Sequence, residues 1–342
     1  MIGFVARELN EAYKDAASPS TPPPEVIDAA IKRGFTRLDD EIVHAGVHKV
    51  FTNPSKLYAA ETLAPALSGS CALLAFYESR SQMLRVACTG DSRAVLGRRS
   101  ANGKWSATAL SADQTGSSDA EANRIRSEHP GEPNVIRNGR VLGGLEPTRA
   151  FGDAVYKWSH DVQMKIKKSF FGRSPSPLLK TPPYVTAEPV VTTTKIEPEM
   201  GDFVVMATDG LWEMLTNEEV IGLVARWLAE QNLGVPGAAS PTTDTSGGGW
   251  FGWLGGGGGG KGDADQQVLP VEKNGEAADE GDGNKTPIRK LQWGVTASQA
   301  ERFVFEDKNA ATHVVRNALG GKDKDMLCAL LTLPSPYSRR YR

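Results

Sequence analysis

The sequence predicts an α+β fold in which antiparallel sheets carry helices on their outer faces. Helical and strand patterns both occur along the 342 residues, of which 39% are hydrophobic. Short apolar runs of strand length adjoin the tight-turn pairs Gly90-Asp91, Asn102-Gly103 and Asn138-Gly139. Such turns join strands that run antiparallel, whereas parallel strands need a long crossover between them. The mixture therefore favours antiparallel sheets with external helices over a parallel α/β sheet.

Two helices are expected near the start of the chain. Residues 1–10 have the composition of a helix interior, and Pro22-Pro-Pro24 precedes Glu25, which is a good helix start. From there one apolar face recurs every three or four residues, at Ile27, Ile31, Phe35, Leu38 and Ile42. The helix is expected to end between His44 and His48. These histidines are four residues apart, but no third ligand accompanies them, so we interpret them as a solvated helix edge.

Strands dominate the next part of the sequence. They are predicted over residues 70–77, 83–88, 94–98, 105–110 and, further on, 202–206. A helix is expected at Asp119–Glu128, followed by a short hairpin around Asn138-Gly139. The basic, Pro- and Ser-rich segment 160–183 is expected to be a loop insertion or surface flap.

The last third of the sequence changes composition sharply. Asn217 is expected to cap a helix with an apolar face. Residues 234–292 contain a glycine tract and acidic clusters, which is typical of a disordered insertion. Order is expected to resume at Ser298, with a helix through Phe303 that ends at Gly320-Gly321. The predicted organisation is one domain over 1–233, the insertion over 234–292, and the rest of the domain over 293–342.

Composition excludes several classes of protein. The net charge of −2 and the absence of a basic stripe argue against nucleic-acid binding. The apolar stretches are only of strand length, so no membrane span is expected. Cys71, Cys88 and Cys328 are scattered, which predicts buried free thiols in a reducing compartment rather than disulfides or a zinc site. Cys88 is not expected to be a phosphatase nucleophile, because its spacing to Arg93 is one residue too short for a phosphate-binding loop.

Asp209 is the strongest candidate functional residue. It follows the predicted strand 202–206 within Ala207-Thr-Asp-Gly-Leu-Trp-Glu213, so its carboxylate leaves an apolar sheet at a strand end. Glu213 comes four residues later and can share a cation if the chain turns there. Asp91 is a third carboxylate, which a Gly90-Asp91 hairpin would hold rigidly. Oxygen ligands of this kind are typical of a magnesium or manganese site.

These motifs together resemble the metal-dependent serine/threonine protein phosphatases of the PPM (type 2C) family. The resemblance rests on three segments, Ala87-Cys-Thr-Gly-Asp-Ser-Arg-Ala94, Gly143-Gly-Leu-Glu-Pro-Thr-Arg-Ala-Phe-Gly-Asp153 and the Asp209 motif. Within the family the sequence is most similar to the mitochondrial pyruvate dehydrogenase phosphatases, in Arg149-Ala-Phe-Gly-Asp-Ala-Val-Tyr-Lys-Trp158, Tyr184-Val-Thr-Ala-Glu-Pro189 and Asn309-Ala-Ala-Thr-His313. The likeness covers most of residues 25–230 and 298–342.

The resemblance implies an αββα sandwich, with two antiparallel sheets stacked face to face and metals at one end. It implies that Asp209 directly binds one of two core ions, Mg²⁺ or Mn²⁺, and so acts in catalysis through the metal. It assigns Asp91 and Glu213 to an additional, weaker metal site. Asp153 matches a family motif residue, and we assign it a structural role in its loop.

Two family segments have no counterpart in the sequence. An upstream Asp-Gly-His-Gly segment, which bridges the core metals, and a basic phosphate-binding residue are not found before Asp91. A downstream Arg-Asp-Asp or Arg-Asp-Asn segment would begin where the chain stops, at Tyr341-Arg342. We therefore expect a sequence truncated at both ends, with terminal strands missing and weakened binding of the core metals.

The leading functional hypothesis is metal-dependent hydrolysis of phosphoserine and phosphothreonine on proteins. The closer resemblance implies the E1 subunit of pyruvate dehydrogenase as substrate and the mitochondrial matrix as location. The opening residues show no transit peptide, so a cytoplasmic location is the alternative. A second hypothesis is a pseudophosphatase that binds a phosphoprotein without catalysis. A glycine-rich scaffold that uses Trp250–Trp253 is a third and less favoured interpretation.

Overall fold

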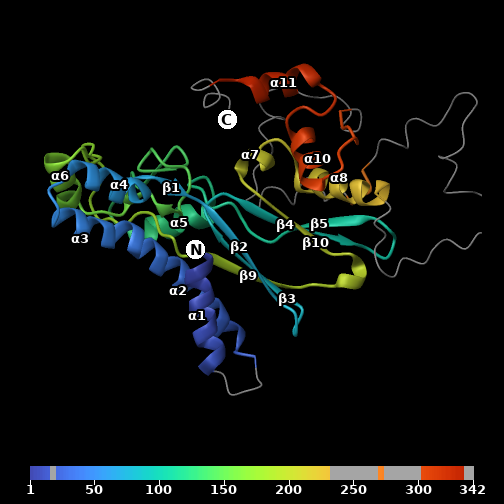
Figure 1. The fold of residues 1–342 in the computed structure, drawn as a ribbon, viewed down its shortest axis with the longest axis horizontal. Coiled ribbons are helices and arrows are strands. Elements are labelled where there is room, and N and C mark those ends of the chain that lie inside the picture. The colour runs from blue at the N-terminus through green and yellow to red at the C-terminus, as the bar shows by residue number, and fades with distance from the viewer. Residues whose placement is uncertain (16–20, 232–268, 273–301, 335–342) are drawn as a thin grey trace, which may run out of the picture.

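Two antiparallel sheets form the centre of the molecule (Figure 1). The computed structural model describes residues 1–15, 21–231, 269–272 and 302–334. One three-stranded sheet has the order β2 (Ala72–Glu78), β3 (Met83–Thr89), β9 (Val190–Lys195), and the other has the order β10 (Phe203–Ala207), β4 (Arg93–Arg99), β5 (Trp105–Ala109). All neighbouring strands in both sheets are antiparallel, as the turn signals predicted.

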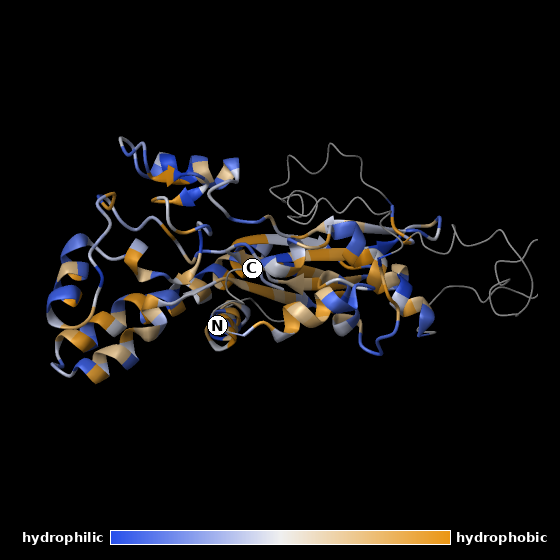
Figure 2. Cartoon of the chain, turned by 90° about the horizontal axis from the view of Figure 1, so that it is seen from above, coloured by the Kyte–Doolittle hydropathy of each residue, from blue (hydrophilic) through white to orange (hydrophobic). Residues whose placement is uncertain are grey.

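The two sheets pack face to face, with helices on both outer faces. A shared core joins Leu84 and Val86 of β3 to Leu96 of β4. Helices α1 (Ile2–Asp15) and α2 (Pro24–Asp40) pack against the β2–β3–β9 sheet, and α8 (Asn217–Glu230) and α10 (Ala310–Ala318) pack against the other. Figure 2 shows that the strands at the centre of the molecule are largely hydrophobic. The predicted αββα sandwich is confirmed.

A helical lobe extends from one end of the sandwich (Figure 1). After α2 the chain continues through a π-helical turn, η1 (Glu41–Ala45), into α3 (Gly46–Phe51), which packs with α4 (Lys56–Leu67), η2 (Ala154–Tyr156) and α6 (His160–Ser169). Trp158 Nε1 donates a hydrogen bond to the Val43 carbonyl (2.9 Å) inside the π-helical turn. His44 and His48 are both exposed here, in agreement with the prediction of a solvated edge.

Short elements connect the lobe to the sheets. They are the pair β1 (Gly69–Ser70) and β8 (Phe151–Gly152), the pair β6 (Ile136–Arg137) and β7 (Arg140–Val141), α5 (Asp119–Glu128) and η3 (Pro198–Met200). The β6–β7 hairpin turns at Asn138-Gly139, where both residues have positive φ, as the sequence predicted.

Beyond β10, the chain forms α7 (Asp209–Trp212) and then α8; α11 (Lys324–Thr332) follows α10. The helix starts follow from side-chain caps. Thr216 and Glu219 form a capping box at α8, so Thr216 rather than Asn217 is the cap. Asn309 caps α10 and Asp323 caps α11 in the same way.

Several predicted elements were wrong. The segment 160–183 contains the helix α6 and is not a loop throughout, because Ser159 caps it and Ile166 is buried in the lobe. The helix predicted from Ser298 is described only from Ala310, since Phe303 and its neighbours run as irregular chain. Cys88 is buried and Cys71 half-buried, but Cys328 is exposed. No helix in the described ranges is long and apolar enough to cross a membrane.

Most of the predicted disordered insertion, residues 234–268 and 273–292 with Trp250, Phe251 and Trp253, lies outside the described residues. Residues 269–272, within it, lie along β5.

Candidate metal site

The register of β10 on β4 brings the two principal candidate residues together. Ala207 pairs with Arg93 and Met206 pairs with Ala94. Asp91 stands two residues before Arg93, and Asp209 stands two residues after Ala207, where the helix α7 (Asp209–Trp212) replaces the strand. Both carboxylates therefore lie at the same end of the sandwich, although 118 positions separate them in the sequence.

The Gly90-Asp91 turn is a corner between the two sheets, so the predicted hairpin was wrong. β3 belongs to one sheet and β4 to the other. Gly90 has φ of +107°, and a Cβ at this position would overlap the Cys71 thiol. The amide of Gly90 donates to Gln114 Oε1 (2.7 Å), and Cys71 Sγ donates to Asp91 Oδ1 (3.2 Å). These contacts anchor the corner that carries Asp91.

Asp209 begins the short helix α7 directly after β10. Its Oδ1 accepts a hydrogen bond from the Gly210 amide (2.8 Å), and its side chain is exposed. Trp212 Nε1 donates to the Ala207 carbonyl (3.0 Å), which ties α7 back to the strand end. The Glu213 amide donates to the Asp209 carbonyl (2.8 Å), so the chain makes the turn that the shared-cation hypothesis required. Residues four apart in a helical turn lie on one face.

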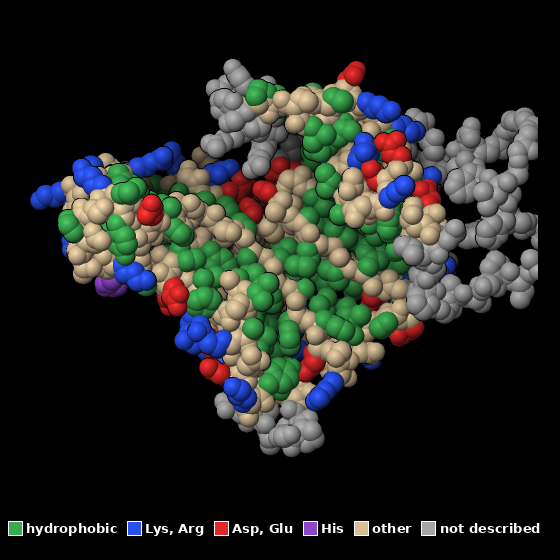
Figure 3. Space-filling view, in the orientation of Figure 1, with side chains coloured by type: hydrophobic (Ala, Val, Ile, Leu, Met, Phe, Trp, Pro, Cys, Tyr) green, Lys and Arg blue, Asp and Glu red, His purple; other side chains and the backbone are tan. Residues whose placement is uncertain are grey.

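The electrostatic environment of Asp91 disfavours its charged form. Burial raises the pKa of Asp91, and the negative charges of Asp209 and Asp113 raise this pKa further, while the hydrogen bond from Cys71 acts against the shift. In the described part of the chain, no lysine or arginine forms an ion pair with Asp91 or Asp209. Figure 3 shows acidic side chains gathered in a hollow between β1 and α7. A cation would relieve this concentration of negative charge.

Arg93 lies beside this site, but its guanidinium already pairs with other residues. Its guanidinium forms a two-point ion pair with Asp113 (Nε–Oδ1 3.0 Å, Nη2–Oδ2 2.7 Å) and donates to Asn217 Oδ1 (2.9 Å). It also lies over the ring of Trp212, 5.2 Å from the centroid. Arg93 thus joins β4 to α7 and to the start of α8, and stabilises the arrangement that presents Asp209.

The donor set fits a hydrated hard cation. Mg²⁺ is commonly held by one or two protein carboxylates and keeps several water ligands, and Asp91 and Asp209 supply two such carboxylates. Among the residues that the structure describes, no group of three or more His, Cys, Asp or Glu side chains could enclose an ion. The described site is therefore an open one, and the assignments of Asp209, Asp91 and Glu213 as ligands stay predictions.

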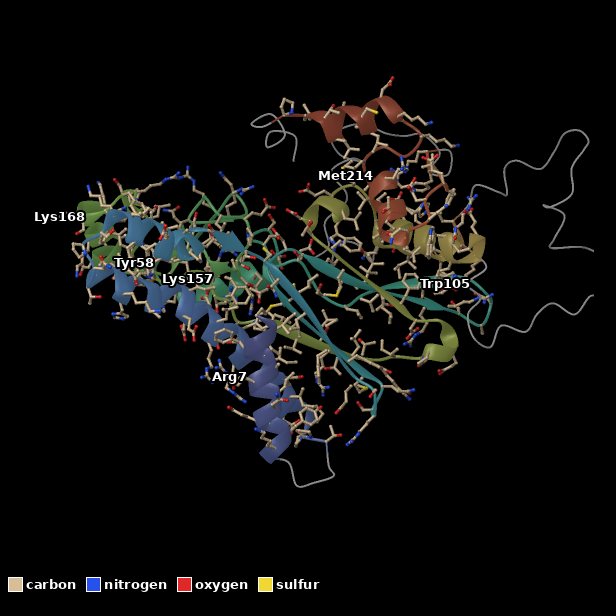
Figure 4. All side chains as sticks on the ribbon, in the orientation of Figure 1. Arg7, Tyr58, Trp105, Lys157, Lys168 and Met214 are labelled. Atoms are coloured by element: carbon tan, nitrogen blue, oxygen red, sulfur yellow. The ribbon has the colours of Figure 1, made fainter. Side chains whose placement is uncertain are left out.

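Asp153 lies in a different environment, at the junction of the sandwich and the lobe. It has a left-handed backbone (φ 46°), and its amide donates to the Ser68 carbonyl (2.9 Å). Burial raises the pKa of Asp153, and the nearby Lys157 opposes this shift. Lys157 itself forms a buried ion pair with Asp39 (2.7 Å) and lies within the lobe (Figure 4). The structural role assigned to Asp153 stays a prediction.

A separate pocket of about 360 Å³ contains none of the three predicted ligands. Arg124 and Arg149 contribute to its wall, and both are already paired with Glu121 (2.7 and 2.8 Å). Because Glu128 and Glu188 also line it, the pocket offers no net positive charge to an anion. We therefore place the candidate site at Asp209 and not in this pocket.

Sequence reasoning missed the residues that support the site, namely Cys71, Arg93, Asp113, Trp212 and Asn217. Arg93 and Trp212 stand inside the motifs that were singled out, so their proximity was a usable signal. Cys71 and Asp113 carry no such signal, because only the pairing of distant strands brings them to Asp91. The rejection of Cys88 as a nucleophile agrees with the structure, in which burial raises the pKa of this thiol to about 12.

Curated relatives match along most of the chain. A pyruvate dehydrogenase phosphatase 1 of Saccharomyces cerevisiae is 41% identical over all of this chain and 56% of its own length. A protein phosphatase 2C homolog of Schizosaccharomyces pombe is 41% identical over all of this chain and 66% of its own length. The human mitochondrial pyruvate dehydrogenase phosphatase 1 is 32% identical over 92% of this chain and 53% of its own length. The chain thus spans between about half and two thirds of the length of these relatives.

The solved structures that match part of the chain are more distant in sequence. A serine-threonine phosphatase 2C from Toxoplasma gondii is 18% identical, with a TM-score of 0.41, over 66% of this chain and 65% of the other. The catalytic domain of the serine/threonine protein phosphatase PstP, solved in complex with two manganese ions, is 17% identical, with a TM-score of 0.29, over 68% of this chain and 73% of the other.

The family model described as protein phosphatase 2C matches residues 6–243, which is more than half of the chain. This range includes the corner at Asp91, the strand β10 and the Asp209 motif. The chain belongs to the protein phosphatase 2C family.

Proposed function

We propose that the chain hydrolyses phosphoserine and phosphothreonine on proteins, with Mg²⁺ or Mn²⁺ held by Asp209, Asp91 and Glu213. The observation that supports this proposal is that Asp91 precedes β4 and Asp209 follows its partner strand β10, so that their negative charges interact at one end of the sandwich. Family membership supports the reaction class. The negative charges around Asp91, for which the described residues provide no ion-pair partner, support a metal.

The chain's own residues would hold and orient the reacting groups. A bound divalent ion would supply a Lewis acid that lowers the pKa of a bound water and neutralises phosphoryl oxygens. Asp209 would bind this ion from the exposed start of α7. Asp91, at the corner, and Glu213 would hold an additional ion beside it. Trp212 and Arg93 would keep α7 in place through their contacts with Ala207 and Asn217.

The names of the relatives indicate the substrate. Several are pyruvate dehydrogenase phosphatases described as mitochondrial. We infer that this chain acts on a phosphoprotein, namely the E1 subunit of pyruvate dehydrogenase, in the mitochondrial matrix. No nucleic-acid partner is proposed, since the net charge is −2.

The test is hydrolysis of a phosphoserine peptide by the 342-residue chain with Mn²⁺ or Mg²⁺ and with a chelator. We expect activity that requires the metal and falls by about 100-fold or more in Asp209→Asn, since the metal supplies several kcal/mol of stabilisation. Asp161→Asn is the matched control, because Asp161 is fully exposed on α6. Equal activity in Asp209→Asn and the control would refute the assignment.

A second candidate function is phosphoprotein binding without catalysis. One observation favours it: the described residues provide no group of three ligands around Asp209. In that case the phosphorylated E1 subunit would bind the chain and remain phosphorylated with either metal. Phosphate release measured beside pull-down of phosphorylated and unphosphorylated E1 distinguishes the two functions.

A further inference from the structure

The outer edge of β5 is covered by a short segment from the middle of the predicted insertion. Trp105 donates its amide hydrogen to the Pro270 carbonyl (2.9 Å), and the Glu272 amide donates to the Trp105 carbonyl (2.8 Å). Trp105 and Val271 thereby form a parallel bridge. Two backbone hydrogen bonds that flank one residue are the pattern of strand addition to a sheet edge.

Residues of α8 and of the β10–β4–β5 sheet contact this segment. Leu269 and Val271 pack against the buried cluster between α8 and the β10–β4–β5 sheet. Gly222 of α8 makes room for Leu269, because a Cβ on residue 222 would lie 2.7 Å from Leu269 Cβ. Trp105 lies on β5 beneath this region, with its ring against Phe203 (Figure 4).

The last residue of the segment is held by the turn between β4 and β5. Glu272 accepts hydrogen bonds from Ser100 Oγ (3.1 Å) and Asn102 Nδ2 (3.0 Å). These hydrogen bonds lower the pKa of Glu272. The site therefore has two apolar positions, a carbonyl acceptor at a proline and an acidic position, each with a matching group on the fold.

We propose that the edge of β5 is a binding site for an extended peptide of the pattern apolar–Pro–apolar–Glu, and that its occupant is residues 269–272 of the same chain. We call these residues the strap. Among the residues that the structure describes, the strap joins the insertion to the sheet, which the composition of 234–292 gave no reason to expect. It also covers an edge whose free amide and carbonyl groups could otherwise pair with another chain.

Binding within one chain favours this occupant over a foreign peptide. The strap is tethered on both sides, so its concentration at the edge is set by the connecting segments and is of the order of millimolar. A weak contact with two backbone hydrogen bonds can therefore be occupied, although the same peptide would bind only weakly from solution.

The decisive experiment is amide hydrogen exchange in the full chain, comparing the native protein with Gly222→Ala. Alanine has the higher helix propensity, so the substitution favours α8 while it displaces Leu269. We expect exchange at the Trp105 and Glu272 amides to be at least about ten-fold faster in Gly222→Ala. Gly3→Ala is the matched control, since Gly3 is helical and a Cβ there meets nothing within 4 Å. Two results would overturn the proposal: rapid exchange of the Glu272 amide in the native chain, or equal exchange rates in the native chain and Gly222→Ala.

A second experiment tests the peptide specificity. A labelled peptide with the sequence of residues 267–273 is titrated by fluorescence anisotropy into the full-length double variant Leu269→Asp, Val271→Asp and into the native chain. Binding to the double variant alone supports the site, and a peptide carrying aspartate in place of Val271 should not bind. Because the contact is weak, the titration extends to about millimolar concentration, and absence of binding to a folded double variant over this range overturns the peptide specificity.

Discussion

Glu121 and Asp91 are both acidic residues withdrawn from solvent beside the sheets, but their surroundings shift their pKa values in opposite directions. Glu121 receives hydrogen bonds from Arg149, Arg124 and Thr148, and these outweigh burial and lower its pKa to about 2. Asp91 has one thiol donor and two neighbouring carboxylates, and its pKa is raised. The comparison separates a carboxylate that the protein compensates, as is usual for a structural charge, from one whose described neighbours leave its charge uncompensated.

The largest expected effect is a loss of stability when Glu121, the compensated carboxylate, is replaced. Glu121→Gln should lower the free energy of unfolding by about 3–5 kcal/mol, because the buried Arg149 and the half-buried Arg124 lose the charge that they share. Urea unfolding at pH 7 measures the change. Glu146→Gln is the matched control, since its ion pair with Arg140 has the same 2.7 Å separation as that of Arg124 with Glu121 but is more exposed. The control should lose less than about 1 kcal/mol, and equal losses would contradict the distinction.

Glu121 also predicts the direction in which stability changes with pH in acid. A carboxyl with a lowered pKa stabilises the fold above its unfolded pKa, and the contribution is lost as the pH falls through its folded pKa. For Glu121 this window runs from its ordinary value of 4.5 down to about 2, and the shift corresponds to about 3 kcal/mol. The stability difference between the native chain and Glu121→Gln should therefore shrink as the pH falls across this window. A difference that grew on acidification would exclude this account.

At the candidate metal site, removal of a carboxylate charge is expected to raise stability rather than to lower it. In the presence of a chelator, Asp91→Asn should raise the free energy of unfolding by about 1 kcal/mol, because it removes a partly buried charge that is repelled by Asp209. Thermal unfolding measures the gain, and Asp161→Asn should leave stability within about 0.5 kcal/mol. Added Mg²⁺ should then stabilise the native chain more than the Asp91→Asn variant. Destabilisation of the variant in chelator would mean that Asp91 is structurally compensated.

The smallest expected effect concerns the donor to Asp91. Cys71→Ala removes the Sγ–Oδ1 hydrogen bond and should lower stability by about 0.5–1 kcal/mol, whereas Cys71→Ser keeps a donor and should lose less. Thermal unfolding of the two variants side by side provides the measurement. The reverse order would show that the volume of the sulfur, and not its hydrogen bond, stabilises the corner.

Predictions from the sequence succeeded where a local pattern determines a local conformation. The apolar periodicity from Ile27, the turn at Asn138-Gly139 and the strand before Asp209 are all present in the structure. They failed where the sequence permits two outcomes. Gly90-Asp91 suits a hairpin or a corner, and the difference depends on whether β4 pairs with β3 or with the distant β10. The helix α6 was missed because charged and proline-rich neighbours obscured its short apolar face.

The sequence by itself determined the family, the element types and the carboxylates of interest, because these depend on residue identity and short-range order. Only the tertiary structure decided that Asp91 and Asp209 lie at the same end of the sandwich, that Arg93 supports α7, and that residues 269–272 cover the edge of β5. These features require strand pairing between segments far apart along the chain. The register of such pairing is a cooperative property of the whole sandwich, and no single segment determines it.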